Sequence, residues 1–208
     1  MRIATPLILA LSLTIGSVPA RAQFHTPRRG VWGRIGVGYG SAGTSCNGCG
    51  ASTGSGGLTV SALVGGTPSP HVLIGVGFDL FERSLAGDTL ERMDALGASL
   101  WYFSHVTGGP FAEGGVGVSE YRRERGSYVS GWFGSLPNTD LDGYGVNLHV
   151  GIGWEFDTAR GPISVRLADN YGQAGTLTRY FSNQPAPTGW TNNVLAIEVG
   201  YSYWPRRY

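Results

Sequence analysis

The chain contains 208 residues, of which 35 are glycine, 12% are aromatic and only 14% are charged. With 15 basic and 14 acidic residues, the net charge of +1 gives no support for nucleic-acid binding. The aromatic content argues against a disordered chain, and the glycines lack the period of three that collagen requires. Beyond the N-terminus no apolar run is long enough for a transmembrane helix, so helical membrane spans are excluded.

The first 22 residues have the pattern of a secretory signal. A short apolar stretch runs from Ile3 to Ile15, and Ala20-Arg21-Ala22 supplies a small-x-small cleavage pattern before Gln23. The alternative, an N-terminal anchor helix, is disfavoured because the apolar core is short. We therefore predict a cleaved signal peptide at 1–22 and one domain at 23–208.

Eight segments of the remaining chain alternate between apolar residues and small or polar residues, as strands do. The clearest is 144–157, where every second residue from Tyr144 to Phe156 is apolar and the residues between are glycine or polar. In chain order the segments are 31–39, 58–65, 72–80, 93–103, 112–119, 144–157, 163–168 and 195–203. The sequence therefore predicts an all-β protein with eight strands.

The connections between these segments alternate in length. Those at 66–70, 104–109 and 157–161 are short, whereas those at 41–56, 122–142 and 174–192 are expected to be long loops. Outer-membrane barrels have short turns at the periplasmic end and longer loops at the extracellular end. The pattern therefore predicts an eight-stranded antiparallel up-and-down transmembrane β-barrel.

The inward phase of these segments is mostly glycine, alanine and serine, with a few charged or polar residues among them. An eight-stranded barrel is narrow enough for side chains to fill its interior, and buried charges persist only when they are paired. We therefore expect a network across the lumen, with Arg34 and Arg166 as its hubs. Its expected members are Arg34, Asp79, Glu113, His149, Glu155, Arg166 and Glu198.

Aromatic residues concentrate near the predicted strand ends, as the two interfacial girdles of a membrane barrel require. The simpler explanation is that aromatic residues favour strands in general. The girdle beside the short connections is expected to contain Trp32, Tyr102, Phe103, Phe111, Trp154, Phe156, Tyr201 and Tyr203. The girdle at the opposite end is expected to contain Tyr39, Phe78, Tyr121, Tyr144 and Tyr171.

With these features the chain resembles the small OmpA/OmpX-type outer-membrane β-barrel family over most of residues 30–204. The resemblance includes an aromatic-rich last strand, Leu195–Trp204, after which Pro205, Arg206 and Arg207 precede Tyr208. Family members commonly end with an aromatic residue on the last strand, where the barrel-assembly machinery reads it. The resemblance implies an outer-membrane location, with membrane lipids, lipopolysaccharide and that machinery as partners.

The only cysteines are Cys46 and Cys49. In an oxidising envelope a local disulfide is the expected outcome, while free thiols and a metal or redox role remain alternatives. A zinc site needs further ligands that the sequence does not supply, and glycine spacings inside strand patterns do not form a nucleotide site. No cofactor or metal is therefore implied.

Catalysis is not expected. A resemblance to barrels that deacylate lipid A would require His-x-Ser, but the residues two positions after the four histidines are Pro27, Leu73, Thr107 and Gly151. The arginines of 122–125 could contact lipopolysaccharide phosphates or form a solvated loop edge. We predict an envelope-structural or surface-interaction role for a barrel with a closed lumen. The alternatives are a narrow pore or transport barrel for small or hydrophobic solutes, a soluble ligand-binding barrel and a lipid A-modifying enzyme.

Overall fold

The computed structural model describes residues 28–47, 49–85, 89–125, 139–180 and 185–204. The predicted signal peptide at 1–22 lies outside these residues. No helix in the described ranges is long and apolar enough to cross a membrane.

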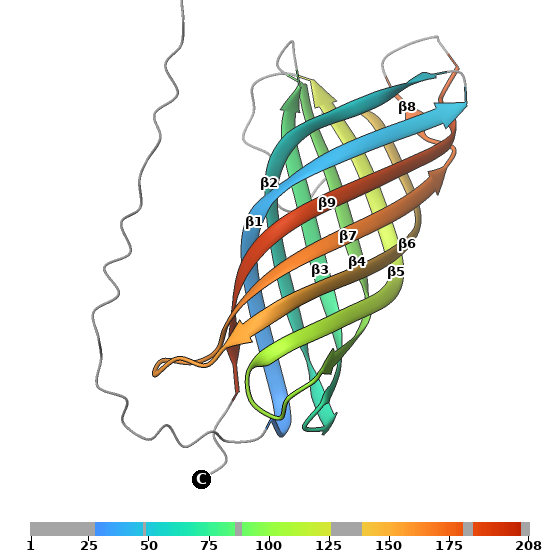
Figure 1. Ribbon diagram of the computed structural model, residues 1–208. Helices are drawn as coiled ribbons and strands as arrows, with labels where there is room; N and C mark the ends of the chain where they lie inside the picture. Colours follow the sequence, from blue (N-terminus) through green and yellow to red (C-terminus); the bar gives the residue numbers. More distant parts are fainter. Residues whose placement is uncertain (1–27, 48, 86–88, 126–138, 181–184, 205–208) are drawn as a thin grey trace, which may run out of the picture.

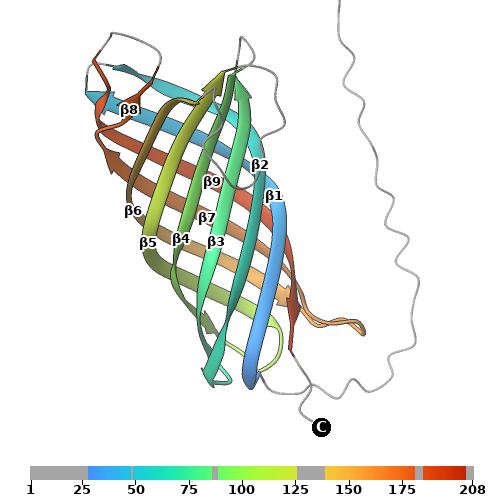
Figure 2. The ribbon, with the colours of Figure 1, turned by 180° about the vertical axis from the view of Figure 1, so that it is seen from behind.

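Eight long strands form a single closed sheet (Figure 1, Figure 2). Each pairs antiparallel with its neighbours, and the pairings of β1 with β9 and of β5 with β6 close the barrel. A ninth strand, β8, has two residues and pairs only with β6. The strands are β1 (Gly30–Asn47), β2 (Cys49–Ser69), β3 (Val72–Leu85), β4 (Thr89–Phe103), β5 (Gly109–Arg125), β6 (Thr139–Phe156), β7 (Ile163–Gly175), β8 (Thr178–Arg179) and β9 (Thr188–Tyr203). The predicted eight-stranded antiparallel up-and-down barrel is confirmed.

Side chains alternate between the outer surface and the lumen along each strand. On β9, for example, Ile197 is 61% exposed while its neighbour Ala196 is 3% exposed. The outward residues of the long strands form an almost continuous apolar band around the barrel. A soluble protein rarely exposes so large an apolar surface, so the band indicates an apolar solvent such as the hydrocarbon of a bilayer.

The two ends of the barrel differ. At one end, which we call the short-turn end, β2 to β3, β4 to β5 and β6 to β7 are joined by turns at 70–71, 104–108 and 157–162. Gly108 and Gly109 have positive φ angles of 54° and 85°, a conformation that glycine adopts readily. The connections at the opposite end, the long-loop end, include 126–138 and the segment containing β8.

The strands extend further toward the long-loop end than the sequence predicts. The expected loop at 41–56 is instead the tip of the β1–β2 hairpin, where pairing continues to Cys46 opposite Cys49. Ala42 and Thr44 point into the barrel and are buried, so the alternation of β1 continues into this Gly- and Ser-rich segment. Its small residues resemble a loop in composition, but the partner strand pairs their backbone groups.

Candidate functional site in the barrel lumen

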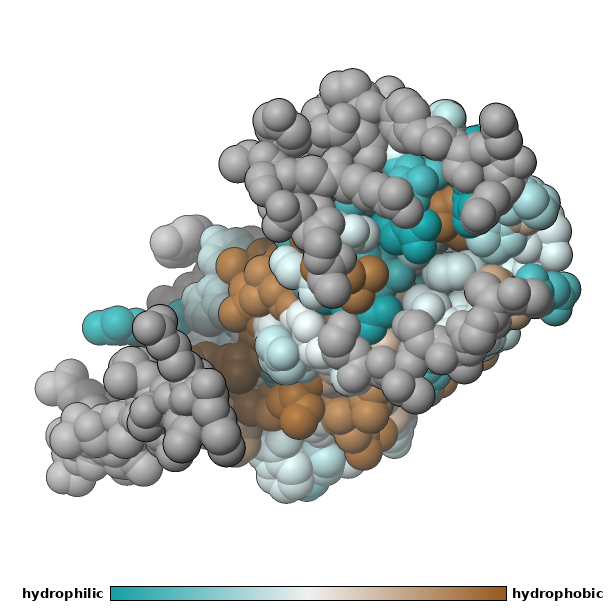
Figure 3. Space-filling view, turned by 90° about the horizontal axis from the view of Figure 1, so that it is seen from above, coloured by the Kyte–Doolittle hydropathy of each residue, from teal (hydrophilic) through white to brown (hydrophobic). Residues whose placement is uncertain are grey.

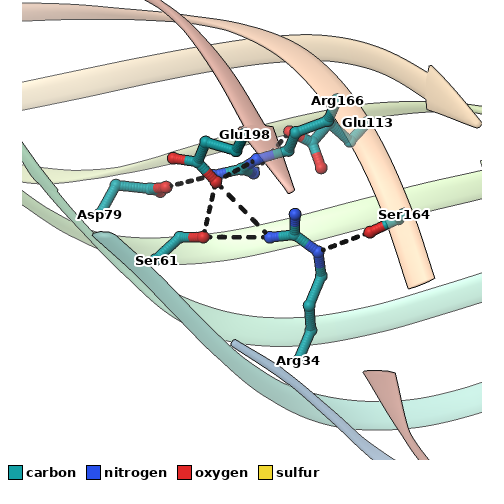
Figure 4. Close-up of polar contacts among 7 residues, drawn as sticks. All are labelled: Arg34, Ser61, Asp79, Glu113, Ser164, Arg166 and Glu198. Carbon is teal, nitrogen blue, oxygen red and sulfur yellow. Dashed lines mark hydrogen bonds and ion pairs between the residues drawn. The ribbon is translucent and has the colours of Figure 1, made fainter. Parts of the chain in front are cut away.

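The lumen contains an ionic layer at its centre, held by Arg166 of β7 (Figure 4). The Arg166 guanidinium donates hydrogen bonds to three carboxylates: Nη2 to Asp79 Oδ1 at 2.6 Å, Nη1 to Glu113 Oε1 at 2.7 Å, and Nε to Glu198 Oε2 at 2.8 Å. These acids come from β3, β5 and β9, so one side chain connects strands on several sides of the barrel.

Arg34 of β1 extends the ionic layer. Its Nε donates to Ser164 Oγ at 3.1 Å and its Nη1 to Ser61 Oγ at 3.0 Å, while Nη1 lies 3.7 Å from Glu198 Oε2. Ser61 in turn donates to the same Glu198 oxygen at 2.7 Å. Glu198 therefore links the two arginines that the sequence analysis expected to be hubs.

Glycines create the space for Arg34 and for Glu113. A Cβ atom at Gly36 would lie 2.6 Å from Ser61 Oγ and 2.9 Å from Arg34 Nη1, and a Cβ at Gly200 would collide with the Arg34 guanidinium. A Cβ at Gly151 would lie 2.6 Å from Glu113 Oε1. The charged side chains of Arg34 and Glu113 therefore lie over inward-facing glycines, where no Cβ atom blocks them.

His149, also expected in the lumen, is buried on β6, and its ring lies over Gly115. Glu155 is buried too but does not bond to Arg34 or Arg166. Instead its Oε1 accepts hydrogen bonds from Arg28 Nη2 at 2.6 Å and Nε at 3.2 Å. Arg28 also donates to the carbonyl oxygens of His105 at 2.7 Å and Gly108 at 3.2 Å. Arg28 thus bridges β6 and the turn at 104–108, closing the short-turn end.

A hydrophobic layer separates this Arg28–Glu155 pair from the ionic layer, and it corrects part of the girdle prediction. Trp32 and Phe111, expected on the outer surface, point inward and are 1% and 4% exposed. Their rings contact Trp101, with centroid distances of 5.8 Å and 4.8 Å. The buried members of the layer are Trp32, Leu63, Leu73, Trp101, Phe103 and Phe111, so the prediction for Phe103 is also wrong.

These residues belong to the inward phase of their strands. Trp32 alternates with the outward Val31 and Gly33, and Phe111 precedes the outward Ala112, but both were assigned to the girdle because they lie near strand ends. The remaining residues expected at this end do lie on the outer surface: Tyr102, Trp154, Phe156, Tyr201 and Tyr203.

A second hydrophobic layer lies on the other side of the ionic layer, toward the long-loop end. Tyr121, expected in the outer girdle at this end, is buried here and contacts Trp190 at a centroid distance of 4.5 Å. Its hydroxyl donates to Glu91 Oε1 at 2.7 Å, and Glu91 pairs with Arg83. The layer consists of Ala42, Phe81, Met93, Tyr121, Leu141, Ala174, Leu177, Trp190 and Val194.

Between the apolar band and the long-loop end, three arginines are paired with acids on the same or a neighbouring strand. Arg92 lies 2.8 Å from Asp94, Arg122 pairs with Glu120, and Arg123 lies 2.6 Å from Asp140. Viewed from the long-loop end, hydrophilic residues gather around the opening, while hydrophobic residues cover much of the visible flank (Figure 3).

Two predictions concern positions that the structure describes only in part. Cys46 lies opposite Cys49 in the β1–β2 register, but the Cys49 side chain is outside the described part of the chain, so the disulfide stays a prediction. The Arg125 side chain is outside it as well. Within the described residues no group of three or more His, Cys, Asp or Glu side chains could hold a metal ion.

The closed antiparallel barrel, its outer apolar band and its polar interior define the class of fold: an eight-stranded antiparallel β-barrel similar to those of outer-membrane proteins of OmpA/OmpX type. No protein-family model and no curated protein matches the sequence. Among solved structures, the attachment invasion locus protein Ail of Yersinia pestis is 12% identical to the chain, with a TM-score of 0.51. That match covers 84% of this chain and 99% of Ail.

Neisserial surface protein A is 13% identical, with a TM-score of 0.52 and coverage of 82% of this chain and 97% of that protein. At such low identity the likeness shows the fold alone. The predicted outer-membrane location agrees with this fold, in which the short-turn end is periplasmic and the long-loop end extracellular.

Proposed function

We propose that the protein is an integral outer-membrane barrel with an envelope-structural or surface-interaction role, and that its lumen does not conduct solutes. The observation that carries the proposal is the Arg166 guanidinium, bound to three carboxylates from three other strands. The two hydrophobic layers and the Arg28–Glu155 pair close the lumen on either side of it. A solute would have to displace all of these layers.

Interaction with other molecules would then occur at the extracellular end. One solved structure of Ail contains a heparin analogue, sucrose octasulfate, so a barrel of this fold can present a surface to a polyanion. In this protein Arg92, Arg122 and Arg123 are each balanced by an acid. Such paired charges favour lipopolysaccharide over a purely anionic ligand, because the arginines can donate hydrogen bonds to its phosphates and the acids can accept hydrogen bonds from its hydroxyl groups.

The remaining parts of the proposal are that 1–22 is a cleaved signal peptide, that Cys46 and Cys49 form a disulfide, that the assembly machinery inserts the barrel, and that it has no catalytic activity. Mass spectrometry of the membrane-extracted protein should give a mature chain beginning at Gln23. A chain that keeps residues 1–22 would contradict the predicted cleavage. Lipid A isolated with and without the protein should have the same mass spectrum, and a loss of acyl chains would contradict the non-enzymatic assignment.

The decisive experiment is conductance across a planar lipid bilayer. The refolded full-length mature chain should give no stable current steps, while a porin inserted under the same conditions gives them. Stable steps that vanish when the protein is heat-denatured would overturn the closed lumen and favour the alternative of a narrow pore. Heat-modifiable mobility on gels shows, independently of current, that the barrel is folded.

A further inference from the structure

The outer surface of the barrel carries an apolar groove, which is separate from the lumen site described above. It has a volume of about 560 Å³ and crosses the outward faces of β9, β1, β2, β3 and β4. Two small outward residues, Gly33 and Ala62, lie within it, and Tyr203, Phe78 and Leu96 are among its larger lining residues. Its volume falls within the range of ~300–1,000 Å³ that is typical of ligand sites.

The groove runs from the periplasmic edge of the apolar band toward the middle of the bilayer. Tyr203 is the last residue of β9, at the short-turn end, and it lies opposite Gly33. From there the paired positions continue through Val64 and Val76, and Leu96 lies well inside β4, which reaches this end at Phe103. An acyl chain entering from the periplasmic headgroup region would follow the same course.

Cationic side chains stand on both sides of β9 at this end. Arg29 is exposed, precedes β1 and shares the outward phase of Gly33, while Arg160 is exposed in the turn at 157–162. Tyr201 donates a hydrogen bond from its hydroxyl to the Arg160 carbonyl at 2.6 Å, which holds this turn against β9. Gly161 permits the contact, because a Cβ there would lie 2.5 Å from the Tyr201 hydroxyl oxygen.

We propose that this groove binds one acyl chain of a periplasmic-leaflet phospholipid whose phosphate lies beside Arg29 and Arg160. Within the apolar band the surroundings supply hydrocarbon, so an acyl chain is the occupant that the lining residues fit. Guanidinium groups at the rim match a phosphate. The inference rests on the membrane-embedded barrel of the proposed function, but not on its closed lumen.

Gly33→Leu tests the groove directly. A Cβ at Gly33 would meet only the Leu63 carbonyl oxygen, at 3.6 Å, so a larger side chain would project into the groove without disturbing the sheet. Gly114→Leu is a matched control: Gly114 is an outward glycine on β5, and a Cβ there would meet only the His149 carbonyl oxygen, at 3.8 Å. It lies outside the groove.

Each full-length mature protein would be refolded in detergent, incubated with phosphatidylglycerol and examined by native mass spectrometry. The wild type and Gly114→Leu should retain one phospholipid, and Gly33→Leu should retain it at least tenfold less often. Diacylglycerol, which has the same chains without phosphate, should be retained less than phosphatidylglycerol, and Arg29→Gln/Arg160→Gln should remove that difference.

Equal retention by Gly33→Leu and the wild type would overturn the proposal. A dimer that is present in the wild type and absent in Gly33→Leu would overturn it as well, by assigning the groove to a second copy of the chain. Heat-modifiable mobility would show that each variant is a folded barrel. A misfolded wild type would contradict the proposed membrane barrel itself, so the two failures are distinguishable.

Discussion

The centre and the ends of the lumen are filled by different kinds of side-chain contact. At the centre, charged side chains from the strands themselves meet around Arg166, and a hydrophobic layer lies on either side of this network. At the periplasmic end the pairing cation, Arg28, lies outside the strands and reaches back to Glu155. Interior charges in this barrel are therefore compensated locally: the central network depends on Arg166 and Arg34, and the pair at the periplasmic end depends on Arg28.

The largest effect is expected from Arg166→Met, because it leaves three carboxylates with only Arg34 to balance them. Breaking a buried ion pair by removing one partner typically costs about 3–5 kcal/mol. The free energy of unfolding, measured by urea titration in detergent with gel mobility as the readout, should fall by an amount in this range. Arg34→Met should cost less, because Arg34 bonds mainly to serines and lies 3.7 Å from a single carboxylate. Equal losses of unfolding free energy in the two variants would contradict the expected difference between Arg166 and Arg34.

A smaller loss is expected from Arg28→Gln. Glu155 would lose its cation, but only one carboxylate would be left uncompensated, against three around Arg166. Hydrogen bonds to charged groups contribute about 1.5–3 kcal/mol, and the loss should not exceed that. Hydrogen exchange should become faster in the turn at 104–108 while the central layer stays protected.

The double variant Arg28→Gln/Glu155→Gln separates pairing from packing. If the two side chains act as a pair, the double variant should lose less stability than the sum of the two single variants. Additive losses, or faster exchange around Arg166, would contradict the local compensation of charge at this end.

The smallest effect is expected at the extracellular tip of the β1–β2 hairpin. A disulfide between Cys46 and Cys49 would close a very short loop, so Cys46→Ser/Cys49→Ser should reduce stability by about 2 kcal/mol or less. Thiol alkylation of the denatured wild type should label neither cysteine before reduction and both afterwards. Labelling without reductant would favour the alternative of free thiols.

The barrel and most of its ionic layer could be predicted because both follow from alternation along the strands. Arg34, Asp79 and Glu198 occupy the inward phase of their segments, so parity alone places them in the lumen. The same rule would have placed Trp32 and Phe111 inside. Their closeness to a strand end favours the girdle, but parity is the stronger constraint on where a side chain points.

Other features carried no sequence signal of this kind. Arg28 precedes the first strand, so no periodicity relates it to Glu155, which is 127 residues away in the chain. The composition of the hairpin at 41–56 predicts a loop, because glycine and serine are common in loops, whereas its structure depends on a partner strand. The outer groove depends on which small residues become neighbours through the strand register, and that register was not predicted.

The glycines opposite the buried arginines have a consequence for how the barrel could vary. Because Gly36 on the same strand and Gly200 on the paired strand β9 leave the volume that the Arg34 side chain fills, residue size is shared between neighbouring lumen positions. A side chain added at either glycine would compete with Arg34 for one space, so neither position can enlarge unless the arginine shortens. Substitutions in this interior are therefore expected to occur in compensating pairs, both along one strand, as for Arg34 and Gly36, and between paired strands, as for Arg34 and Gly200.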